Sequence, residues 1–439
     1  MVHRGKGRRA VSGLPAGAPL ADQRAGIDAC VHCGFCLDAC PTYLTLEDEN
    51  DSPRGRIVLM KALLEGTLAV NDGDVRTHID RCLGCRACET ACPSGVPYGQ
   101  LLEATRATLT RVRPNPAIAR VILFVFARRT LLRLAMFGGR VTRAMRVSTL
   151  LSRLPGRFGF AMAMLESTRS PLRRRTYRPA TGGRRGTAAM LTGCVMDGLF
   201  GETNRATART LVVNGYTMTA APGQRCCGAL HAHAGDDDTA RELARGNIAA
   251  FEQSGADFIV VNAAGCGAMM KEYGHLLAGD PAWRERAAAL SARVRDVSEL
   301  LAEAGPRPGG ALTHTVTYDA PCHLLHAQRV VSPPLAVLGA IPGLALVPLE
   351  GSEHCCGSAG IYNLIEPEVS DRVLSPKLAN IAATGAPLVA TGNPGCLMQL
   401  GAGLRQARMA VRVVHPVDLL DASYAAAGPH GPDSNQMLP

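Results

Sequence analysis

The spacing of hydrophobic residues changes along the 439-residue chain and divides it into three kinds of sequence. From Arg54 to Gly66, apolar residues recur at helical spacing directly after a Ser-Pro pair, which predicts a helix. Residues 111–185 place apolar positions among arginines with the spacing of amphipathic helices. From residue 186 onward, short β-rich apolar runs alternate with helical ones, which predicts α/β units with parallel sheets. The predicted strands include Ala188–Thr192, Phe258–Asn262 and Pro387–Thr391.

The α/β part of the sequence occurs twice. Its cysteines recur at offsets of 128, 129 and 130 residues, and each copy contains a Cys-Cys-Gly triplet. In both copies a helix, a glycine turn, a short strand and a Gly-Cys turn are expected to follow one another. The cysteines then fall where strands end, the usual place for a site in an open α/β sheet. The two sets are Cys194, Cys226, Cys227 and Cys266 in the first repeat and Cys322, Cys355, Cys356 and Cys396 in the second.

Two dense cysteine motifs precede these repeats. Each has the spacing Cys-x2-Cys-x2-Cys-x3-Cys-Pro, the run that binds [4Fe–4S] clusters in bacterial ferredoxins. In such runs the fourth cysteine binds the other cluster, so the two ligand sets exchange one member. We therefore expect the first cluster to bind Cys30, Cys33, Cys36 and Cys92, and the second to bind Cys82, Cys85, Cys88 and Cys40. Two clusters with exchanged ligands lie close together, which suits one-electron relay and not substrate chemistry.

Other interpretations remain open for both groups of cysteines. A four-cysteine zinc site usually consists of two close cysteine pairs, which leaves the third close cysteine and the Cys-Pro ending of each motif unexplained. In the repeats, four thiols per copy could hold a further metal or cluster, take part in thiol redox chemistry, or lie buried and inert in a glycine turn. A disulfide framework is not expected for the 16 cysteines of a cytosolic chain.

The positive charge of the chain is concentrated in the arginine-rich segment. The formal net charge is +10, but residues 103–186 alone contain nineteen Arg against two Glu. This connector could lie on an anionic membrane surface, bind an acidic face of a partner protein, or serve as a solvated linker. Nucleic acid is not expected as a partner, because the chain has one Trp and no recognised nucleic-acid motif. Without a secretory signal, the chain is expected in the cytosol.

These patterns predict an α+β multidomain protein, in which a helical two-cluster ferredoxin-like domain is followed by two tandem α/β Cys-Cys-Gly repeats. The expected parts are a disordered tail at 1–21, the two-[4Fe–4S] domain at 22–110, the Arg-rich amphipathic connector at 111–185, the repeats at 186–305 and 306–424, and a second disordered tail at 425–439.

Together, the motifs resemble the iron–sulfur subunits of bacterial glycolate oxidase (glycolate dehydrogenase) along most of the chain. The resemblance depends on five stretches, which are Cys30 to Cys36, Asp51 to Ile57, Arg81 to Glu89, Gly265 to Gly274, and His354 to Gly360. It implies that FAD-binding partner subunits oxidise glycolate to glyoxylate and pass electrons to the clusters of this chain. A membrane quinone or another membrane acceptor would then receive them, with the chain peripheral on the inner face of the cell membrane. The chain carries no catalytic residue of its own in this scheme.

Related architectures provide the alternatives. Iron–sulfur subunits for lactate or glycerol-3-phosphate oxidation have the same motifs, and a heterodisulfide reductase subunit carries the same repeat. In that reductase each repeat closes with Cys-x-x-Cys, whereas the last positions here are Met269 and Gln399. Each repeat is one thiolate short of that pattern, which argues against its double-lobed cluster and against disulfide cleavage.

Overall fold

The computed structural model describes residues 13–170 and 183–428, which form two units. The first unit comprises Met1–Ala117 and His231–Asp237, and the second comprises Ile118–Leu230 and Asp238–Pro439. The predicted tails at 1–21 and 425–439 lie largely outside the described residues, as do residues 171–182 of the connector. Ordered structure begins before the predicted boundary, because Leu20 is fully buried within a 3-10 helix.

The first unit is helical, as predicted. The prediction for Arg54 to Gly66 is confirmed by α3, which begins where the Ser52 hydroxyl accepts a 2.9 Å hydrogen bond from the backbone N–H of Gly55. Helix α6 packs against η1, α3 and α4 and buries Leu101 and Leu102 in the core of the unit. The helices are η1 (Pro19–Gln23), α1 (Arg24–Asp28), α2 (Pro41–Leu46), η2 (Glu49–Asp51), α3 (Pro53–Leu64), α4 (Gly73–Asp80), α5 (Ala87–Thr90) and α6 (Tyr98–Val112).

One short segment of the first predicted repeat belongs to this first unit. Residues 231–237 begin within α13 (Ala229–His233) and contact α6. The His233 ring nitrogen lies 2.9 Å from a carboxylate oxygen of Glu103, and the Arg106 guanidinium donates to the His233 carbonyl at 3.0 Å. The first predicted repeat, residues 186–305, therefore contains a short segment of the first unit, which the sequence did not predict.

In the second unit, each repeat contains a four-stranded parallel sheet, as predicted. The strand orders are β2-β1-β3-β4 and β6-β5-β7-β8. In the first sheet, Ala188 pairs with Met218 of β2 on one side and with Phe258 of β3 on the other. The second strand of each sheet therefore lies on one side of the first strand, and the third strand lies on its other side, which creates a topological switch point beside β1 and beside β5. The strands are β1 (Thr187–Met190), β2 (Thr217–Thr219), β3 (Phe258–Val261), β4 (Val294–Asp296), β5 (Thr315–Tyr318), β6 (Ala345–Val347), β7 (Leu388–Ala390) and β8 (Arg412–Val414).

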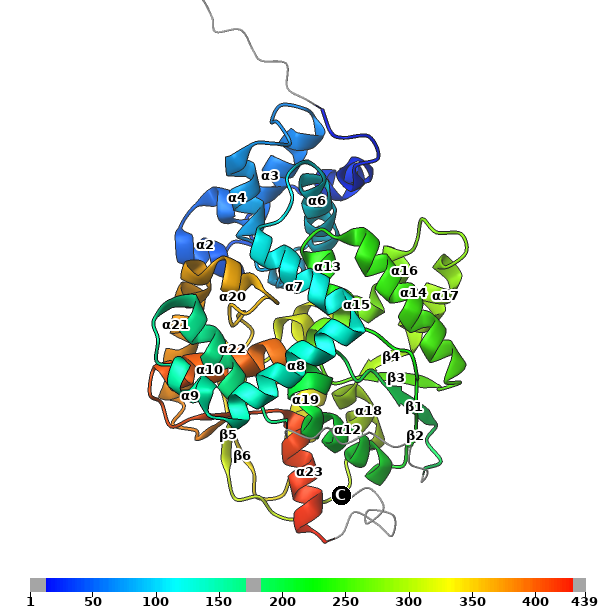
Figure 1. Cartoon of the computed structure of the whole chain (residues 1–439), viewed down its shortest axis with the longest axis vertical. Helices are drawn as coiled ribbons and strands as arrows, with labels where there is room; N and C mark the ends of the chain where they lie inside the picture. The colour runs from blue at the N-terminus through cyan, green and yellow to red at the C-terminus, as the bar shows by residue number, and fades with distance from the viewer. Residues whose placement is uncertain (1–12, 171–182, 429–439) are drawn as a thin grey trace, which may run out of the picture. The chain divides into compact units, whose positions relative to one another are not determined.

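A shared hydrophobic layer joins the two repeats. Figure 1 shows helices on both faces of the first sheet, with α12 and α18 on one face and α14 and α17 on the other. Helix α12 packs against α23 of the second repeat, and α18 packs against α19. The helices of the repeats are α11 (Val195–Leu199), α12 (Gly201–Val213), α14 (Asp237–Gln253), α15 (Ala264–Lys271), α16 (Tyr273–Leu276), α17 (Arg284–Arg293), α18 (Val297–Ala304), η3 (His323–Ala327), α19 (Ser332–Gly339), α20 (Tyr362–Ile365), α21 (Pro367–Ala383), α22 (Pro394–Gln406) and α23 (Pro416–Ala426).

The described part of the connector forms amphipathic helices that pack on both repeats. Helix α8 contacts α11 of the first repeat, and α10 contacts α22 of the second. This packing makes the connector a structural part of the second unit and not a solvated linker over its described residues. Among those residues, no helix combines the length and hydrophobicity needed to cross a bilayer. The connector helices are α7 (Ala117–Ala127), α8 (Arg129–Ala144), α9 (Val147–Leu151) and α10 (Gly156–Glu166).

Candidate iron–sulfur and thiol sites

The first cysteine motif lies in the loop between α1 and α2. Gly34 has a φ of +89°, a conformation that glycine adopts at little cost, and it lets the loop fold back tightly. Cys40 is the N-cap of α2, and the proline after it begins the helix. The Cys33 side chain is exposed and Cys40 is buried. The loop thus presents three cysteines on one turn and directs the fourth into the interior.

The second motif lies between α4 and α6 and includes the short helix α5. Cys82, Cys85 and Cys88 are all buried. The Cys82 sulfur accepts hydrogen bonds from the backbone N–H of Gly84 at 3.4 Å and from the Tyr98 hydroxyl at 3.6 Å. Donors aimed at a cysteine sulfur stabilise its thiolate form, which is the form that binds metal.

The two motifs meet, and each predicted ligand set is brought together. One cavity of the first unit is lined by all four cysteines of the first set, together with Cys88. The second set lies around Cys88, whose pKa is affected by the other three cysteines. Burial raises the pKa of the Cys88 thiol, and the charges of Cys85, Cys82 and Cys40 raise it further. The members of the first set are Cys30, Cys33, Cys36 and Cys92.

Burial favours the protonated form of the Cys36 thiol. Burial raises the pKa of Cys36 to about 11, and nearby Cys30 and Cys40 add to the effect, while backbone N–H groups oppose it. A thiol with such a pKa releases its proton when iron is bound, so assembly of a centre here is coupled to proton release. Eight sulfurs in two sets of four, each set drawn from both loops, fit the ligand demand of two [4Fe–4S] clusters.

A buried ion pair beside the second set was missed by sequence reasoning. Arg56 and Asp51 are both fully buried, and their side chains meet at 3.0 Å. The Arg56 guanidinium also donates to the Thr42 hydroxyl at 3.0 Å, and that hydroxyl lies 3.3 Å from the Cys40 sulfur. In the sequence, the stretch from Asp51 to Ile57 contributes to the family resemblance but does not indicate a buried ion pair.

In the first repeat, four thiols converge at the switch point between β1 and β3. The sulfurs of Cys226 and Cys194 are 3.7 Å apart. Hydrogen bonds with Cys226 and Cys266, together with burial, raise the pKa of Cys227. Tyr273, which directly follows the segment containing Cys266, is fully buried and donates to the Cys227 carbonyl at 2.8 Å. It therefore supports the Cys-Cys turn and does not line an open site.

In the second repeat, four thiols converge in the same way between β5 and β7. The sulfur of Cys322 lies 3.9 Å from that of Cys355, and the sulfur of Cys356 lies 3.3 Å from that of Cys396. Hydrogen bonds with Cys355 and Cys396 lower the pKa of Cys356 well below its usual value, and the positive charge of Lys377 contributes. No disulfide links any of the sixteen cysteines, all of which lie within the described residues.

A single side chain connects the two thiol groups. The Asn393 side-chain oxygen accepts a hydrogen bond from the backbone N–H of Gly265, the residue before Cys266, at 3.2 Å. The nitrogen of the same side chain donates to the Cys396 sulfur at 3.5 Å. The two four-thiol groups are therefore neighbours, although their cysteines are about 130 residues apart in sequence.

The positions that lack a fifth cysteine are occupied by packed side chains. Met269 is buried in α15. Gln399 is fully buried in α22, where it accepts a hydrogen bond from Asn363 at 2.8 Å and donates to Ser370 at 2.9 Å. Each repeat thus brings together four thiols and no fifth.

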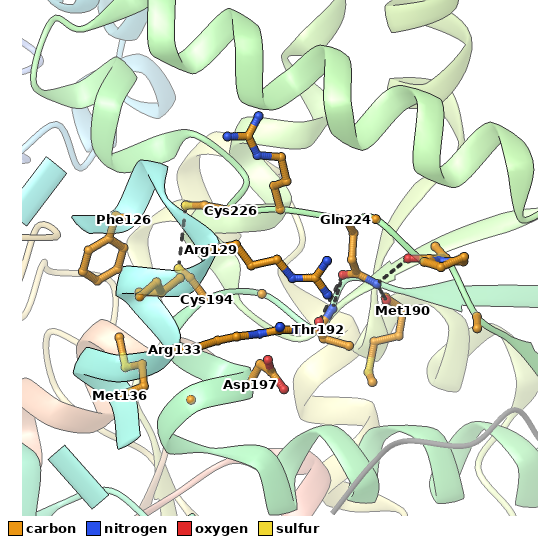
Figure 2. Close-up of a pocket in the computed structure, with 18 of the residues that line it drawn as sticks. Phe126, Arg129, Arg133, Met136, Met190, Thr192, Cys194, Asp197, Gln224 and Cys226 are labelled. Atoms are coloured by element: carbon orange, nitrogen blue, oxygen red, sulfur yellow. Dashed lines mark hydrogen bonds between the residues drawn. The ribbon is translucent and has the colours of Figure 1, made fainter. Parts of the chain in front are cut away.

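A pocket of about 480 Å³ opens onto the first thiol group. It lies beyond the carboxyl ends of β1 and β2, and Figure 2 shows Cys194 and Cys226 on one side of it. Arg129 and Arg133 of α8 extend into the pocket, as Figure 2 also shows. The thiols of the first repeat are therefore approached from a pocket with positive charge on its wall.

Comparisons with known proteins agree with this geometry. A family model described as a 4Fe-4S dicluster domain matches residues 26–96, and a model described as a cysteine-rich domain matches residues 188–271 and 316–401. The "Probable glycolate oxidase iron-sulfur subunit" of Bacillus subtilis is 40% identical over 411 residues, which cover 89% of this chain and 92% of the relative. The "Glycolate oxidase iron-sulfur subunit" of Escherichia coli is 36% identical over 399 residues, covering 88% of this chain and 93% of the relative. The "Lactate utilization protein A" of Exiguobacterium is 30% identical over 241 residues, covering 54% of this chain and 98% of the relative.

The matched domains contain both cysteine motifs and both repeats, in the order that the structure shows. The predicted fold class is confirmed, since a helical ferredoxin-like region is followed by two cysteine-rich repeats with parallel sheets. The family matches support an iron–sulfur electron-transfer role. This chain belongs to the glycolate oxidase iron–sulfur subunit family.

Proposed function

We propose that this chain is the electron-transfer subunit of an FAD-dependent glycolate dehydrogenase complex. The partner subunits would oxidise glycolate to glyoxylate, and the chain would pass the electrons toward a membrane quinone. The observation that supports the proposal is the meeting of the two cysteine loops, in which Cys30, Cys33, Cys36 and Cys92 line one cavity together with Cys88. The names of the two full-length relatives point to glycolate as the substrate of the complex.

In this proposal, Cys30, Cys33, Cys36 and Cys92 hold one [4Fe–4S] cluster, and Cys82, Cys85, Cys88 and Cys40 hold the other. Bound clusters supply one-electron transfer at potentials that their surroundings adjust. The chain contributes the deprotonated sulfurs, the donors that stabilise them, and a buried setting for the second set.

The first set is the proposed point of electron entry. Its Cys33 side chain is exposed, and the neighbouring Val31 and Phe35 expose 67% and 68% of their surface. Exposed apolar side chains around a redox centre favour docking of a partner protein. A flavoprotein seated on Val31 and Phe35 would bring its flavin near the first cluster.

Each repeat is proposed to hold a further metal centre through its four thiols. The sulfur–sulfur distances of 3.3 to 3.9 Å between cysteines from different loops support this assignment. Inert packing would not require four sulfurs to meet at the switch point of both sheets. The centre would differ from one with five cysteine ligands, because Gln399 and Met269 take the fifth positions.

The connector is the proposed membrane-docking surface. Its helices expose Phe124, Leu134 and Phe137 by 51%, 67% and 49%, among many arginines. Apolar side chains interleaved with positive charge suit the interface of an anionic bilayer. Flotation with vesicles of anionic phospholipid is expected to carry the chain, and vesicles of neutral phospholipid are expected to leave it behind. Equal flotation with both would contradict electrostatic docking.

The decisive experiment for the main proposal is an anaerobic substrate assay of the co-purified complex. Glycolate should bleach the visible absorption of the chain only when the flavoprotein is present. Lactate and glycerol 3-phosphate serve as matched controls, and bleaching by one of these in place of glycolate would assign the sister activity. A chain without iron and acid-labile sulfide would remove the basis of the proposal.

A further inference from the structure

Two arginines at the start of α3 lie beside different sets of cluster cysteines. They are Arg54 and Arg56, separated by Gly55. Only glycine fits between them, because a Cβ atom at Gly55 would lie 1.9 Å from the carbonyl oxygen of Glu49. A helix turns by about 100° per residue, so side chains two positions apart leave it in nearly opposite directions. The tripeptide therefore sends one guanidinium toward each cysteine set.

Arg54 faces the first cysteine motif. Its backbone N–H donates a hydrogen bond to the Cys36 sulfur. Its guanidinium lies against the loop at Gly34, within 3.0 Å of the place that a Cβ atom would take. Glu49 compensates this charge with two hydrogen bonds, of 2.6 and 3.2 Å. The Arg54 side chain is 33% exposed, so solvent also screens it.

Arg56 faces the second set and is fully buried. A guanidinium only donates hydrogen bonds, so the Thr42 oxygen must accept from Arg56 and keeps its own proton for another acceptor. The two acceptors within reach of that proton are the Cys40 sulfur at 3.3 Å and the Asp51 carbonyl oxygen at 2.9 Å. The positive charge thus approaches a sulfur ligand through one hydroxyl group.

The two sets differ in the burial of the arginine beside them. Asp51 is the carboxylate partner of Arg56 at 3.0 Å, and it also pairs with Arg81 at 3.2 Å. The Asp48 carboxylate and the His78 ring lie within 4.8 Å of the Asp51 carboxylate. At the first set, Arg54 pairs with Glu49 and is partly exposed. The second set has the deeper burial, because all four of its cysteines are buried.

We propose that Arg56 raises the reduction potential of the second cluster above that of the first, so that an electron entering the first unit comes to rest at the second cluster. The inference depends on the proposed ligation by the eight cysteines. Reduction adds one negative charge to a cluster, and a nearby positive charge stabilises the reduced form. The effect is stronger where burial lowers the effective dielectric constant, which favours Arg56 over Arg54. Arg56 acts on the cluster through its charge and through Thr42, and is a positioning residue.

The test is a redox titration of the intact, anaerobically purified chain, followed by electron paramagnetic resonance. The Arg56→Gln variant should make reduction of one cluster at least tenfold less favourable, a shift of about 59 mV for a one-electron couple. Arg54→Gln should move the signal of the other cluster, and by less. Arg56→Lys keeps the charge and should restore most of the potential. Arg24→Gln, at a 53% exposed side chain that pairs with Asp28 and Glu65, is the control and should move neither signal.

A second variant keeps the test decisive if Arg56→Gln does not fold. Arg81→Gln leaves Arg56 in place but removes a second, partly exposed positive charge beside Asp51, so the potential of the same cluster should fall by a smaller amount. Iron and sulfide are counted in every variant. A wild-type chain without them contradicts the ligation itself. If the variants keep their iron, this inference alone is contradicted when Arg56→Gln or Arg81→Gln leaves both reduction potentials unchanged. It is also contradicted when both clusters shift by the same amount.

Discussion

The two repeats share one fold and one cysteine pattern, yet they surround their thiols with different charges. Asn247 in α14 and Lys377 in α21 lie 130 residues apart, the offset that separates Cys266 from Cys396. Asn247 is neutral and hydrogen bonds with the Cys226 carbonyl at 3.0 Å. Lys377 is an almost fully buried cation at the same place in the second repeat.

The residue that directly follows the first strand of each repeat differs in the same sense. Asp319 pairs with Lys377 at 2.8 Å, and both side chains are 2% exposed. The residue 128 positions earlier is Leu191, a buried apolar side chain. The second repeat therefore has a buried ion pair where the first has a leucine and an asparagine. Hydrogen bonds with Cys355 and Cys396 are the main cause of the lowered pKa of Cys356, and the positive charge of Lys377 adds to them.

The comparison teaches that duplication preserved the thiol geometry while the electrostatics diverged. Four sulfurs meet at the switch point of each sheet because the backbone places them there. The charge that these sulfurs experience is set by side chains from the neighbouring helix and strand. Two centres with the same ligands would thus differ in their preferred charge state, which is a useful property in a chain of electron carriers.

The largest expected effect comes from removing one partner of the buried ion pair. Lys377→Met leaves the Asp319 carboxylate buried without its cation, and should lower the free energy of unfolding of the second repeat by about 3–5 kcal/mol. Hydrogen exchange of the β5 and β7 amides would measure this locally. The control is Lys271→Met in the first repeat, where the partly exposed pair with Glu299 should be worth about 1 kcal/mol or less. Equal losses in the two variants would contradict the contrast between the repeats.

A second contrast concerns the residue that caps the last helix of each repeat. His415 caps α23, and its Nδ1 accepts from the Val417 N–H while its Nε2 donates to the Asn262 carbonyl. Burial lowers the pKa of His415 to about 4 from 6.5. The unfolded chain then binds more protons between pH 6.5 and 4, so stability is complete above pH 6.5 and is lost as the pH falls toward 4. The loss should reach about 3 kcal/mol.

The His415→Gln variant checks this expectation, because glutamine can hydrogen bond without titrating in this range. Amide exchange in α23 should become steeply faster on acidification in the wild type and should lose that part of its pH dependence in the variant. Comparison at equal pH removes the intrinsic pH dependence of exchange. If amide exchange in α23 accelerates on acidification as much in His415→Gln as in the wild type, the buried ring is not the acid-sensitive group.

Asp296 caps α18 in the first repeat and should respond to pH in the opposite direction. Burial raises the pKa of Asp296 to about 6 from 3.8, although hydrogen bonds from Ser298 oppose the shift. The folded chain then holds its proton more tightly, so stability falls as the pH rises from about 4 to 6. The change should be slightly under 3 kcal/mol by the same relation. Asp296→Asn keeps the capping acceptor and should abolish the pH dependence of stability in α18. The pH dependence of stability in α23 should remain. If the stability of α18 and that of α23 change with pH in the same direction, the assignment of Asp296 and His415 as the responsible groups is contradicted.

Much of this architecture could be predicted from the sequence, because its signals are local. The Ser-Pro start of α3, the strand positions and the two cysteine motifs all depend on neighbouring residues and on fixed spacing. The repeat was visible because its cysteines recur at nearly one offset. The assignment of ligands to clusters also followed from spacing, and the cavity brings the first of these sets together.

The remaining features depend on contacts between distant segments. The predicted Gly-Cys turns are in fact the first turns of helices, since Gly265-Cys266 lies in α15 and Gly395-Cys396 in α22. The pairing of Lys377 with Asp319 joins residues 58 positions apart, and neither position alone indicates a buried charge. Alignment of the two repeats does place lysine against asparagine, so a charge difference could have been noticed, but not its burial.

The smallest expected effect comes from converting the second repeat to the chemistry of the first. The double variant Asp319→Leu with Lys377→Asn places the pair found at Leu191 and Asn247 into the second sheet. Replacing both members of a buried ion pair leaves no uncompensated charge, so the double variant should lose no more than about 2 kcal/mol, less than Lys377→Met alone. Asn247→Ala in the first repeat is the matched control, because it removes hydrogen bonds to the Cys226 carbonyl and from the Arg225 N–H without touching a charge. A double variant as unstable as Lys377→Met would mean that Lys377 contributes mainly through its hydrogen bonds to the Gly351 and Ser352 carbonyls, and that the ion pair is not what distinguishes the two repeats.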